Sequence, residues 1–289
     1  MLELIIQGMH RFKKRFASRL NFSQIPLISS LRKIMIFAMR KKIVEDVNGY
    51  TMYVDDRDTL ALSWHHTFEP VTTDFFKKNI KYGQTVIDLG ANIGYFTLLF
   101  SGLVGSTGHV YAFEPEPENA NLLRKNLELN SIKNVTVIQK AVDSKVTTRL
   151  LHINKKNRGN HQIFYEGEYR ETIEVQSTTL DDYFSNQDLK IDWIKMDIEG
   201  AEVEALQGMK NLIYHNPKLI LVTEIFAPGL IAAGSSVEEY ILALNDLKFE
   251  FEKIDEGLKS INHLPVEELI GSFSSMHSLS HPNIICRRA

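Results

Sequence analysis

The chain has 289 residues, of which 44% are hydrophobic and 24% charged, which is typical of a globular protein and excludes a disordered or fibrous one. No apolar run approaches the roughly 18 residues of a membrane-spanning helix, and the first residues lack the pattern of a signal peptide. The single cysteine, Cys286, excludes an internal disulfide and fits a reducing compartment, so we expect a cytoplasmic protein.

The net charge of −3 hides an asymmetry along the chain. Residues 1–42 contain ten Lys or Arg against one acid and carry +9, which leaves −12 for the rest. Alternating basic and apolar clusters predict a basic helical N-terminal arm over residues 1–44, which packs on the main domain or on a second subunit, or contacts the inner membrane face peripherally. The acidic body argues against a nucleic-acid groove. The oligomeric state stays open, with a homodimer as one alternative.

The second predicted domain covers residues 45–289. A β-hairpin is expected at 44–56, around Asn48-Gly49, and a helix from Pro70 to about Lys81. Further strands are predicted at 85–90, 109–115, 135–142, 191–197, 218–225, 249–254 and 282–288. Further helices are predicted at 94–104, 117–130, 200–213 and 236–247. Apolar strands that alternate with amphipathic helices are typical of an α/β fold in which helices cover both faces of a parallel sheet.

The stretch 144–180 interrupts this alternation. It holds the polar sequence "NKKNRGNHQ" between two runs of alternating apolar and polar residues. Such runs predict an inserted β-hairpin, and long excursions at the edge of a sheet often carry function.

The sequence "VIDLGANIGYFT" at 86–97 ends a strand and begins a helix. Gly90 and Gly94 allow a tight turn and the close approach of a ligand, where a Cβ would collide. The free N–H groups of the following helix favour an anion, and Asp88 adds a negative charge beside them. Helix N–H donors together with a carboxylate suit a zwitterion better than a pyrophosphate.

A second acid, Glu114, ends the next predicted strand, where it can accept both hydroxyls of a ribose. Two cofactors fit a glycine turn followed by such an acid. A nicotinamide dinucleotide requires G-x-G-x-x-G, and "GANIG" lacks the middle glycine. S-adenosylmethionine requires an acid before the turn, the turn itself and an acid ending the second strand, and all three are present. The pattern therefore favours S-adenosylmethionine over oxidoreduction.

Several blocks resemble the FkbM family of S-adenosylmethionine-dependent methyltransferases. They are "FEPVTTDFF" (68–76), "VIDLGANIGYFTLLF", "YAFEPEPENANLLRKNLELN", "TTLDDYF" (178–184) and "KMDIEGAEVEALQG" (195–208), and the likeness runs over about residues 45–225. The resemblance implies a seven-stranded class I methyltransferase sheet, which is Rossmann-like, and methyl transfer to a hydroxyl oxygen.

The family pattern also implies a cofactor site, residue by residue. It places the methionine part near Asp88, Gly90, Asn92 and Gly94, the ribose on Glu114, and the adenine beside Pro115, Ala141 and Val142. It adds Glu69 from the lead-in helix, and Asp197 of "MDIEG" as the residue closest to the sulfonium and the acceptor.

Transfer to a hydroxyl requires a general base. Asp197 and Glu199 are the first candidates and His161 is the third, although each has a simpler interpretation as an orienting, helix-favouring or solvent-facing group. Paired carboxylates are also able to hold a divalent cation, but no metal is expected. We expect a small-molecule or glycan acceptor, with a sugar hydroxyl of a glycan or glycolipid preferred. A polyketide-like or other secondary metabolite and a non-catalytic methyltransferase-like binding module are the alternatives.

Overall fold

The computed structural model describes residues 42–154, 157, 159–165, 171–187, 189–274 and 281–288. The predicted basic arm falls almost wholly on residues 1–41 and so lies outside the described part. None of the described helices has the length and apolar character needed to cross a membrane.

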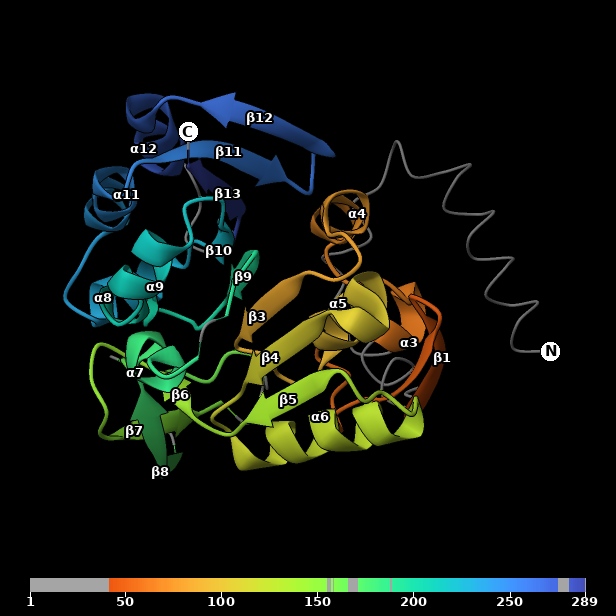
Figure 1. Ribbon diagram of the computed structural model, residues 1–289. Coiled ribbons are helices and arrows are strands. Elements are labelled where there is room, and N and C mark those ends of the chain that lie inside the picture. Colours follow the sequence, from red (N-terminus) through yellow and green to blue (C-terminus); the bar gives the residue numbers. More distant parts are fainter. Residues whose placement is uncertain are drawn as a thin grey trace, which may run out of the picture. The chain divides into compact units, whose positions relative to one another are not determined.

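A mixed eight-stranded sheet forms the centre of the described domain (Figure 1). Its strands, in spatial order, are β12 (Ser260–Leu264), β11 (Phe249–Asp255), β13 (Asn283–Arg288), β10 (Ile220–Glu224), β9 (Trp193–Met196), β3 (Thr85–Leu89), β4 (His109–Phe113) and β5 (Val135–Ile138). The five strands from β10 to β5 are parallel. β13 is antiparallel to both its neighbours, β10 and β11. The predicted α/β fold is therefore confirmed, but the sheet is mixed, and β12 adds an eighth strand at one edge.

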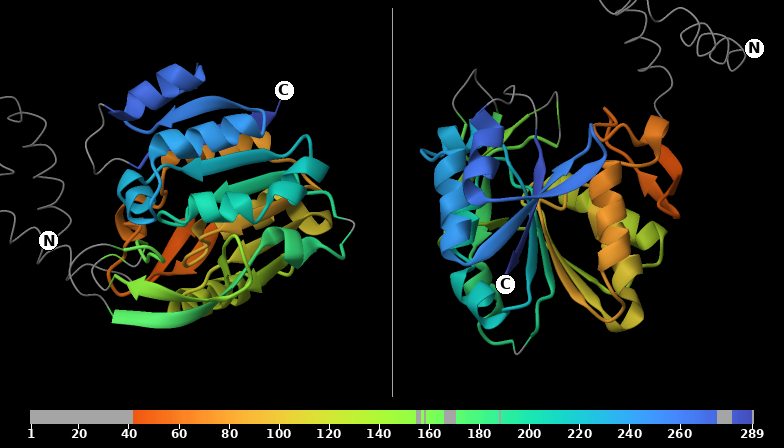
Figure 2. Two further views of the ribbon diagram at one scale, coloured as in Figure 1. Left: turned by 90° about the vertical axis from the view of Figure 1, so that its left-hand side faces the viewer. Right: turned by 90° about the horizontal axis from the view of Figure 1, so that it is seen from above.

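Helices cover both faces of the sheet, as predicted (Figure 2). The described helices are α3 (Leu62–His65), α4 (Pro70–Asn79), α5 (Tyr95–Val104), α6 (Pro117–Leu129), α7 (Leu180–Phe184), α8 (Glu202–Gln207), α9 (Lys210–His215), α10 (Ala227–Ala232), α11 (Val237–Asp246) and α12 (Val266–Ser274), with a 3₁₀ turn at Gly105–Thr107. α4, α5 and α6 lie on one face, and α8, α9, α11 and α12 lie on the other. The sheet is buried between the two layers, which explains why its parallel strands are mainly apolar.

An aromatic cluster joins α4 and α5 to the sheet. Phe76 is fully buried, and its ring centroid lies 4.7 Å from that of Phe100 and 6.1 Å from that of Trp193. The rings meet edge to face, the arrangement that aromatic pairs favour. This packing fixes α4 against α5 and the sheet.

Both predicted hairpins are present. β1 (Ile43–Val47) and β2 (Tyr50–Tyr53) pair around Asn48-Gly49. Within the predicted insertion, β7 (Thr148–Ile153) pairs antiparallel with β8 (Glu171–Thr178). β6 (Ala141–Val142) joins β8 in this separate three-stranded sheet.

One strand and one helix that were predicted as continuous are each divided in the structure. The strand expected at 135–142 ends at Ile138, because the chain turns there at the sheet edge and continues as β6 in the second sheet. The helix expected at 200–213 begins only at Glu202 and breaks after Gln207. A Cβ on Gly208 would lie 2.0 Å from the carbonyl oxygen of Asp143, so the backbones meet there and the helix is interrupted.

Candidate active site

A cavity of about 380 Å³ opens at the carboxyl edge of the parallel strands. Of the twelve residues predicted for the cofactor or catalysis, every one except Gly94 lines it. Those that line it are Glu69, Asp88, Gly90, Asn92, Glu114, Pro115, Ala141, Val142, His161, Asp197 and Glu199. Residues far apart in the sequence are thus gathered in one place, as expected for the ends of neighbouring parallel strands.

Gly90 and Gly94 of the turn allow other parts of the chain to approach closely, and not only a ligand. Gly90 has a φ of +78°, and a Cβ there would lie 1.8 Å from the carbonyl oxygen of Asp197. Gly94 has a φ of +95°, and its Cβ would lie 2.3 Å from Leu123 on α6. The tight turn was predicted correctly, but Gly94 serves the packing of α5 against α6 and lies away from the cavity wall.

Asp88, at the end of β3, is fully buried at the base of the cavity. Thr97 donates a hydrogen bond of 2.6 Å to its Oδ2, whereas Oδ1 has no partner among the described residues. Burial raises the pKa of Asp88, and the charge of Lys195 opposes that shift. A buried carboxylate oxygen without a donor is costly, so this atom fits a cationic or hydrogen-bonding ligand group.

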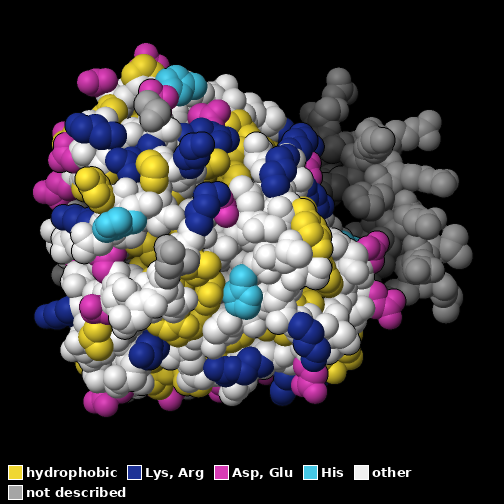
Figure 3. Space-filling view, in the orientation of Figure 1, with side chains coloured by type: hydrophobic (Ala, Val, Ile, Leu, Met, Phe, Trp, Pro, Cys, Tyr) yellow, Lys and Arg dark blue, Asp and Glu magenta, His cyan; other side chains and the backbone are white. Residues whose placement is uncertain are grey.

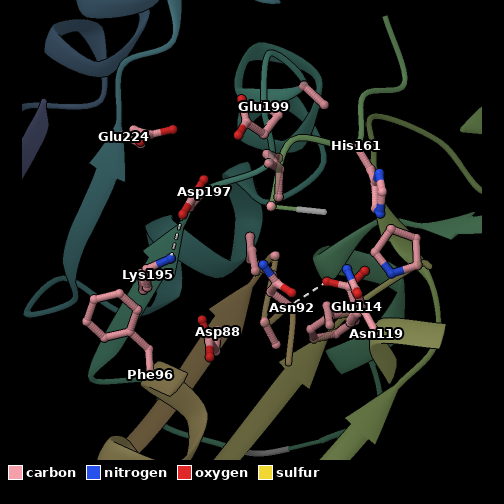
Figure 4. A pocket seen from close by; sticks show the side chains of 18 of the residues that line it. Asp88, Asn92, Phe96, Glu114, Asn119, His161, Lys195, Asp197, Glu199 and Glu224 are labelled. Carbon is pink, nitrogen blue, oxygen red and sulfur yellow. Dashed lines mark hydrogen bonds and ion pairs between the residues drawn. The ribbon is translucent and has the colours of Figure 1, made fainter. Parts of the chain in front are cut away.

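Glu114, directly after β4, holds the turn in shape (Figure 4). Its Oε2 accepts a hydrogen bond of 2.7 Å from the backbone N–H of Asn92, and its Oε1 accepts one of 3.0 Å from that of Glu116. Burial raises the pKa of Glu114 to about 7, although both hydrogen bonds lower it. Each carboxylate oxygen can accept a second donor, so the group remains able to bind two hydroxyls. Pro115, Ala141 and Val142 line the cavity with it.

Lys195 and Asp197 face the same cavity from β9 and its end. The buried ammonium of Lys195 lies 3.0 Å from Oδ2 of Asp197 and 4.8 Å from the centroid of the Phe96 ring. Burial lowers the pKa of Lys195, but the carboxylates of Asp197, Asp88 and Glu69 outweigh burial and raise it. Lys195 therefore stays charged and holds the neighbouring acids together.

Glu69 reaches the site from the loop before α4. Its backbone is left-handed, with a φ of +42°, and its Oε2 accepts a hydrogen bond of 2.9 Å from Asn283 on β13. The hydroxyl of Tyr95 accepts a hydrogen bond from the backbone N–H of Phe68, which ties this loop to α5. Burial raises the pKa of Glu69 to about 7.

Glu199 lies in the turn between β9 and α8, before the helix begins, and has a φ of +55°. Burial raises its pKa to about 9, and Asp197 and Glu202 add to the shift. Glu224, at the end of β10, also faces the cavity, and burial raises its pKa too. Figure 4 shows Glu224 and Asp197 on one side of the pocket and Glu114 and Asn119 on the other.

The inserted hairpin supplies His161, which lines the cavity. The backbone N–H of Asn154 donates a hydrogen bond of 3.0 Å to its Nδ1. Asn160, its neighbour in sequence, donates one of 2.7 Å to Oε2 of Glu199. The insertion therefore forms part of the wall that faces the acidic residues.

Among the cavity-lining residues that sequence reasoning missed are Lys195 and His281. Lys195 stands two residues before Asp197, so the strand period alone places both side chains on one side of β9. His281 precedes β13, and Asn283 pairs with Glu224. Because β13 is antiparallel, its first residues meet the carboxyl end of β10, a signal available only once that pairing is known.

The residues present fit S-adenosylmethionine. Among the described residues that line the cavity, six are acids and two are lysines, which favours a ligand with a sulfonium and an ammonium group. The Glu114 carboxylate lines the cavity and can accept further donors, and the unpartnered Oδ1 of Asp88 suits a donor as well. The cavity volume also lies within the usual range for a small-molecule site.

The strand order, with one antiparallel strand inserted beside β10, and a site at the carboxyl edge define a class I, Rossmann-like methyltransferase fold. A family model described as the methyltransferase FkbM domain matches residues 88–251, more than half of the chain. The chain therefore belongs to the FkbM methyltransferase domain family.

Individual relatives match over shorter stretches. The chain is 45% identical over 56 residues to a protein-L-isoaspartate O-methyltransferase of Methanosarcina mazei, which covers 19% of this chain and 23% of that protein. It is 27% identical over 144 residues to methyltransferase 1 of Beauveria bassiana, covering 43% of this chain and 57% of that protein. The chain thus matches less than two thirds of the length of either relative. A candidate rRNA methylase structure from Clostridium thermocellum covers 75% of this chain and 95% of its own, at 15% identity and a TM-score of 0.48.

Proposed function

We propose that this protein transfers the methyl group of S-adenosylmethionine to a hydroxyl oxygen, with a sugar of a glycan or glycolipid as the preferred acceptor. The observation that carries the proposal is the placement of Glu114 and Asp88 at the ends of adjacent strands around one acidic cavity. Membership of the FkbM domain family supports the same reaction class.

When bound, S-adenosylmethionine supplies a methyl group already activated on a sulfonium. The protein then has to hold donor and acceptor in line, which is where much of the rate arises. Glu114 would hold the ribose diol, and the unpartnered Oδ1 of Asp88 would hold the amino group. Asp197, whose side chain is 24% exposed and fixed by Lys195, faces the acceptor.

In the transfer, the acceptor oxygen forms a bond to the methyl carbon, the carbon–sulfur bond breaks, and the hydroxyl proton leaves. We assign this proton to Asp197, because its carboxylate lines the cavity and is oriented by a hydrogen bond of 3.0 Å that the buried ammonium of Lys195 donates to its Oδ2. His161 accepts a hydrogen bond at Nδ1, so its neutral ring carries the proton on Nε2. We assign it to donate a hydrogen bond to the acceptor.

The polar lining supports a sugar as acceptor. Amide side chains of Asn92, Asn119 and Asn157 share the cavity with the carboxyl groups, and such groups suit the many hydroxyls of a sugar. On the face seen in Figure 3, Lys and Arg side chains lie among polar, apolar and acidic ones.

Calorimetry of S-adenosylmethionine binding tests the proposal. Glu114→Gln keeps the shape of the side chain but removes the charge that accepts the ribose hydroxyls. We expect the Kd to rise about 10-fold to 100-fold, since a hydrogen bond to a charged group contributes about 1.5–3 kcal/mol. The control, Glu128→Gln, changes an exposed glutamate on α6 and leaves the Kd unchanged. Absence of binding to the wild type would show that the proposal is wrong.

Acceptor class is tested separately with isotopically labelled S-adenosylmethionine. Glycans, lipid-linked sugars and polyketide-like alcohols are incubated with the enzyme, and labelled products are identified by mass spectrometry. Labelled sugar hydroxyls support the proposal, labelled secondary metabolites favour the alternative acceptor, and cofactor binding without labelling of any acceptor favours a non-catalytic module.

A further inference from the structure

Two carboxyl groups and one imidazole meet at the side of the cavity away from Glu114. Glu199, Glu224 and His281 each offer one oxygen or nitrogen atom, and these three atoms lie within 4.8 Å of one another. Oδ2 of Asp197 is paired with Lys195, but among the described residues no lysine or arginine forms an ion pair with Glu199 or Glu224. Glu199 and Glu224 therefore share a cavity wall on which the nearby ammonium of Lys195 is paired with a third acid, Asp197.

Glu224 holds an oxygen that lacks a partner. The residue is 7% exposed, and its buried Oε2 has no hydrogen-bond partner among the described residues. The nearest candidate, Nδ1 of His281, lies 3.4 Å away. A buried carboxylate oxygen without a hydrogen-bond donor is costly, so this atom suits a cation or a donor group.

Close backbone and ring contacts hold Glu199, Glu224 and His281 near one another. Gly200, next to Glu199, packs so closely on Gly229 that a Cβ would lie 2.5 Å from the Gly229 carbonyl carbon. This contact holds the turn after β9 against α10, the helix that follows the Glu224 strand. The ring of His281 stacks on Phe226, with centroids 4.7 Å apart and an interplanar angle of 22°. Asn160 in turn orients the Glu199 carboxylate.

We propose that Glu199, Glu224 and His281 form a binding site for a divalent transition-metal ion. Ligand bonds of about 2.1 Å place neighbouring ligand atoms about 3.0–3.4 Å apart, so atoms that now lie within 4.8 Å of one another have to close by at most about 1.8 Å. Rotation of the two carboxylates supplies that movement. A carboxylate and imidazole set suits Mn²⁺, Fe²⁺ or Zn²⁺ better than Mg²⁺ or Ca²⁺, which prefer oxygen ligands alone.

The metal site adds a means of binding the acceptor, and this role rests on the proposed methyltransferase function. Three protein ligands leave coordination positions open toward the cavity, where an acceptor hydroxyl can bind and become more acidic. The acceptor class is then an alcohol able to ligate a metal, as the adjacent hydroxyls of a sugar do. The transfer still balances, since the hydroxyl proton leaves, the oxygen–carbon bond forms and the carbon–sulfur bond breaks.

Titration with Mn²⁺ tests the site in the full chain after treatment with a chelator. Electron paramagnetic resonance of free Mn²⁺ gives the stoichiometry and the Kd, and pulsed measurements report a nitrogen ligand through its coupling to the bound ion. We expect one Mn²⁺ per chain and a nitrogen coupling in the wild type. Glu224→Gln, which keeps the shape, and His281→Ala should each weaken binding at least about 10-fold, and His281→Ala should also abolish the coupling.

The control is Glu238→Gln, a change of an exposed glutamate on α11, which should leave the Kd for Mn²⁺ unchanged. No binding to the wild type, no nitrogen coupling, or equal affinity in wild type and both site variants would overturn the metal site. Calorimetry of S-adenosylhomocysteine on the same samples separates the two proposals. If the wild type does not bind S-adenosylhomocysteine, the methyltransferase proposal is contradicted. The metal site is judged only from the binding of Mn²⁺.

Discussion

The ammonium of Lys195 lies 3.0 Å from Oδ2 of Asp197, and the lysine side chain is only 3% exposed. This pair supplies the buried positive charge that balances the acids at the end of β9. Removal of one partner of a buried ion pair leaves the other uncompensated, which costs about 3–5 kcal/mol. We therefore expect Lys195→Met to lower the free energy of unfolding by about that amount in urea titrations.

Lys190 provides the matched control for that substitution. It also pairs with an aspartate two residues later, Asp192, but its own side chain is 70% exposed. Exposed ion pairs contribute at most about 1 kcal/mol, so Lys190→Met should have a small effect. Equal losses from the two substitutions would mean that the Lys195 pair is not structurally important.

The turn after β3 makes a second prediction. Gly90→Ala combines a left-handed backbone with a Cβ 1.8 Å from the Asp197 carbonyl oxygen, so the two strand ends must separate. We expect a loss of about 3 kcal/mol or more of stability. Gly49→Ala has a similar φ of +85° but no atom within 4 Å of the new Cβ, and should cost about 1–2 kcal/mol. Thermal unfolding of both variants compares them, and a Gly90→Ala variant as stable as Gly49→Ala contradicts the close approach.

The raised pKa values of the buried acids predict how stability depends on pH. Burial raises the pKa of Glu199 from 4.5 to about 9 and that of Glu114 to about 7. Above about pH 4.5, these carboxyl groups ionise in the unfolded chain but stay protonated in the folded chain. The free energy of unfolding therefore falls as pH rises. The Tm of metal-free, ligand-free protein should therefore fall between about pH 5 and about pH 9.

Glu199→Gln isolates the main contributor to this fall. The amide cannot ionise, and its oxygen can still accept the hydrogen bond from Asn160. The Tm of Glu199→Gln should decline less steeply with pH than that of the wild type, whereas Glu128→Gln should follow the wild type. A decline as steep in Glu199→Gln as in the wild type would show that Glu199 ionises normally.

The basic segment at residues 1–42 predicts binding to anionic membranes. Replacement of Lys13, Lys14 and Arg15 by glutamate in the full chain reverses the charge of its densest cluster. Co-sedimentation with vesicles that contain phosphatidylserine should then fall to the level seen with neutral vesicles. Unchanged co-sedimentation would contradict membrane binding through this segment.

The cofactor half of the site was predictable because its signals are local in sequence. Asp88, the glycine turn and Glu114 lie within one strand–helix–strand unit, so spacing and residue type define their roles. His281 was missed because its position depends on β13 pairing antiparallel with a strand about 60 residues earlier, which periodicity does not encode. The break at Gly208 was missed for a similar reason, since its cause is a contact with the distant Asp143.

A crystal structure with S-adenosylhomocysteine tests the central claim most directly. We predict the product in the cavity between β3 and β4, with both ribose hydroxyls on the Glu114 carboxylate, its amino group on Asp88, and its sulfur toward Asp197. An empty cavity at saturating ligand, or a nucleoside bound away from Glu114, would contradict the account.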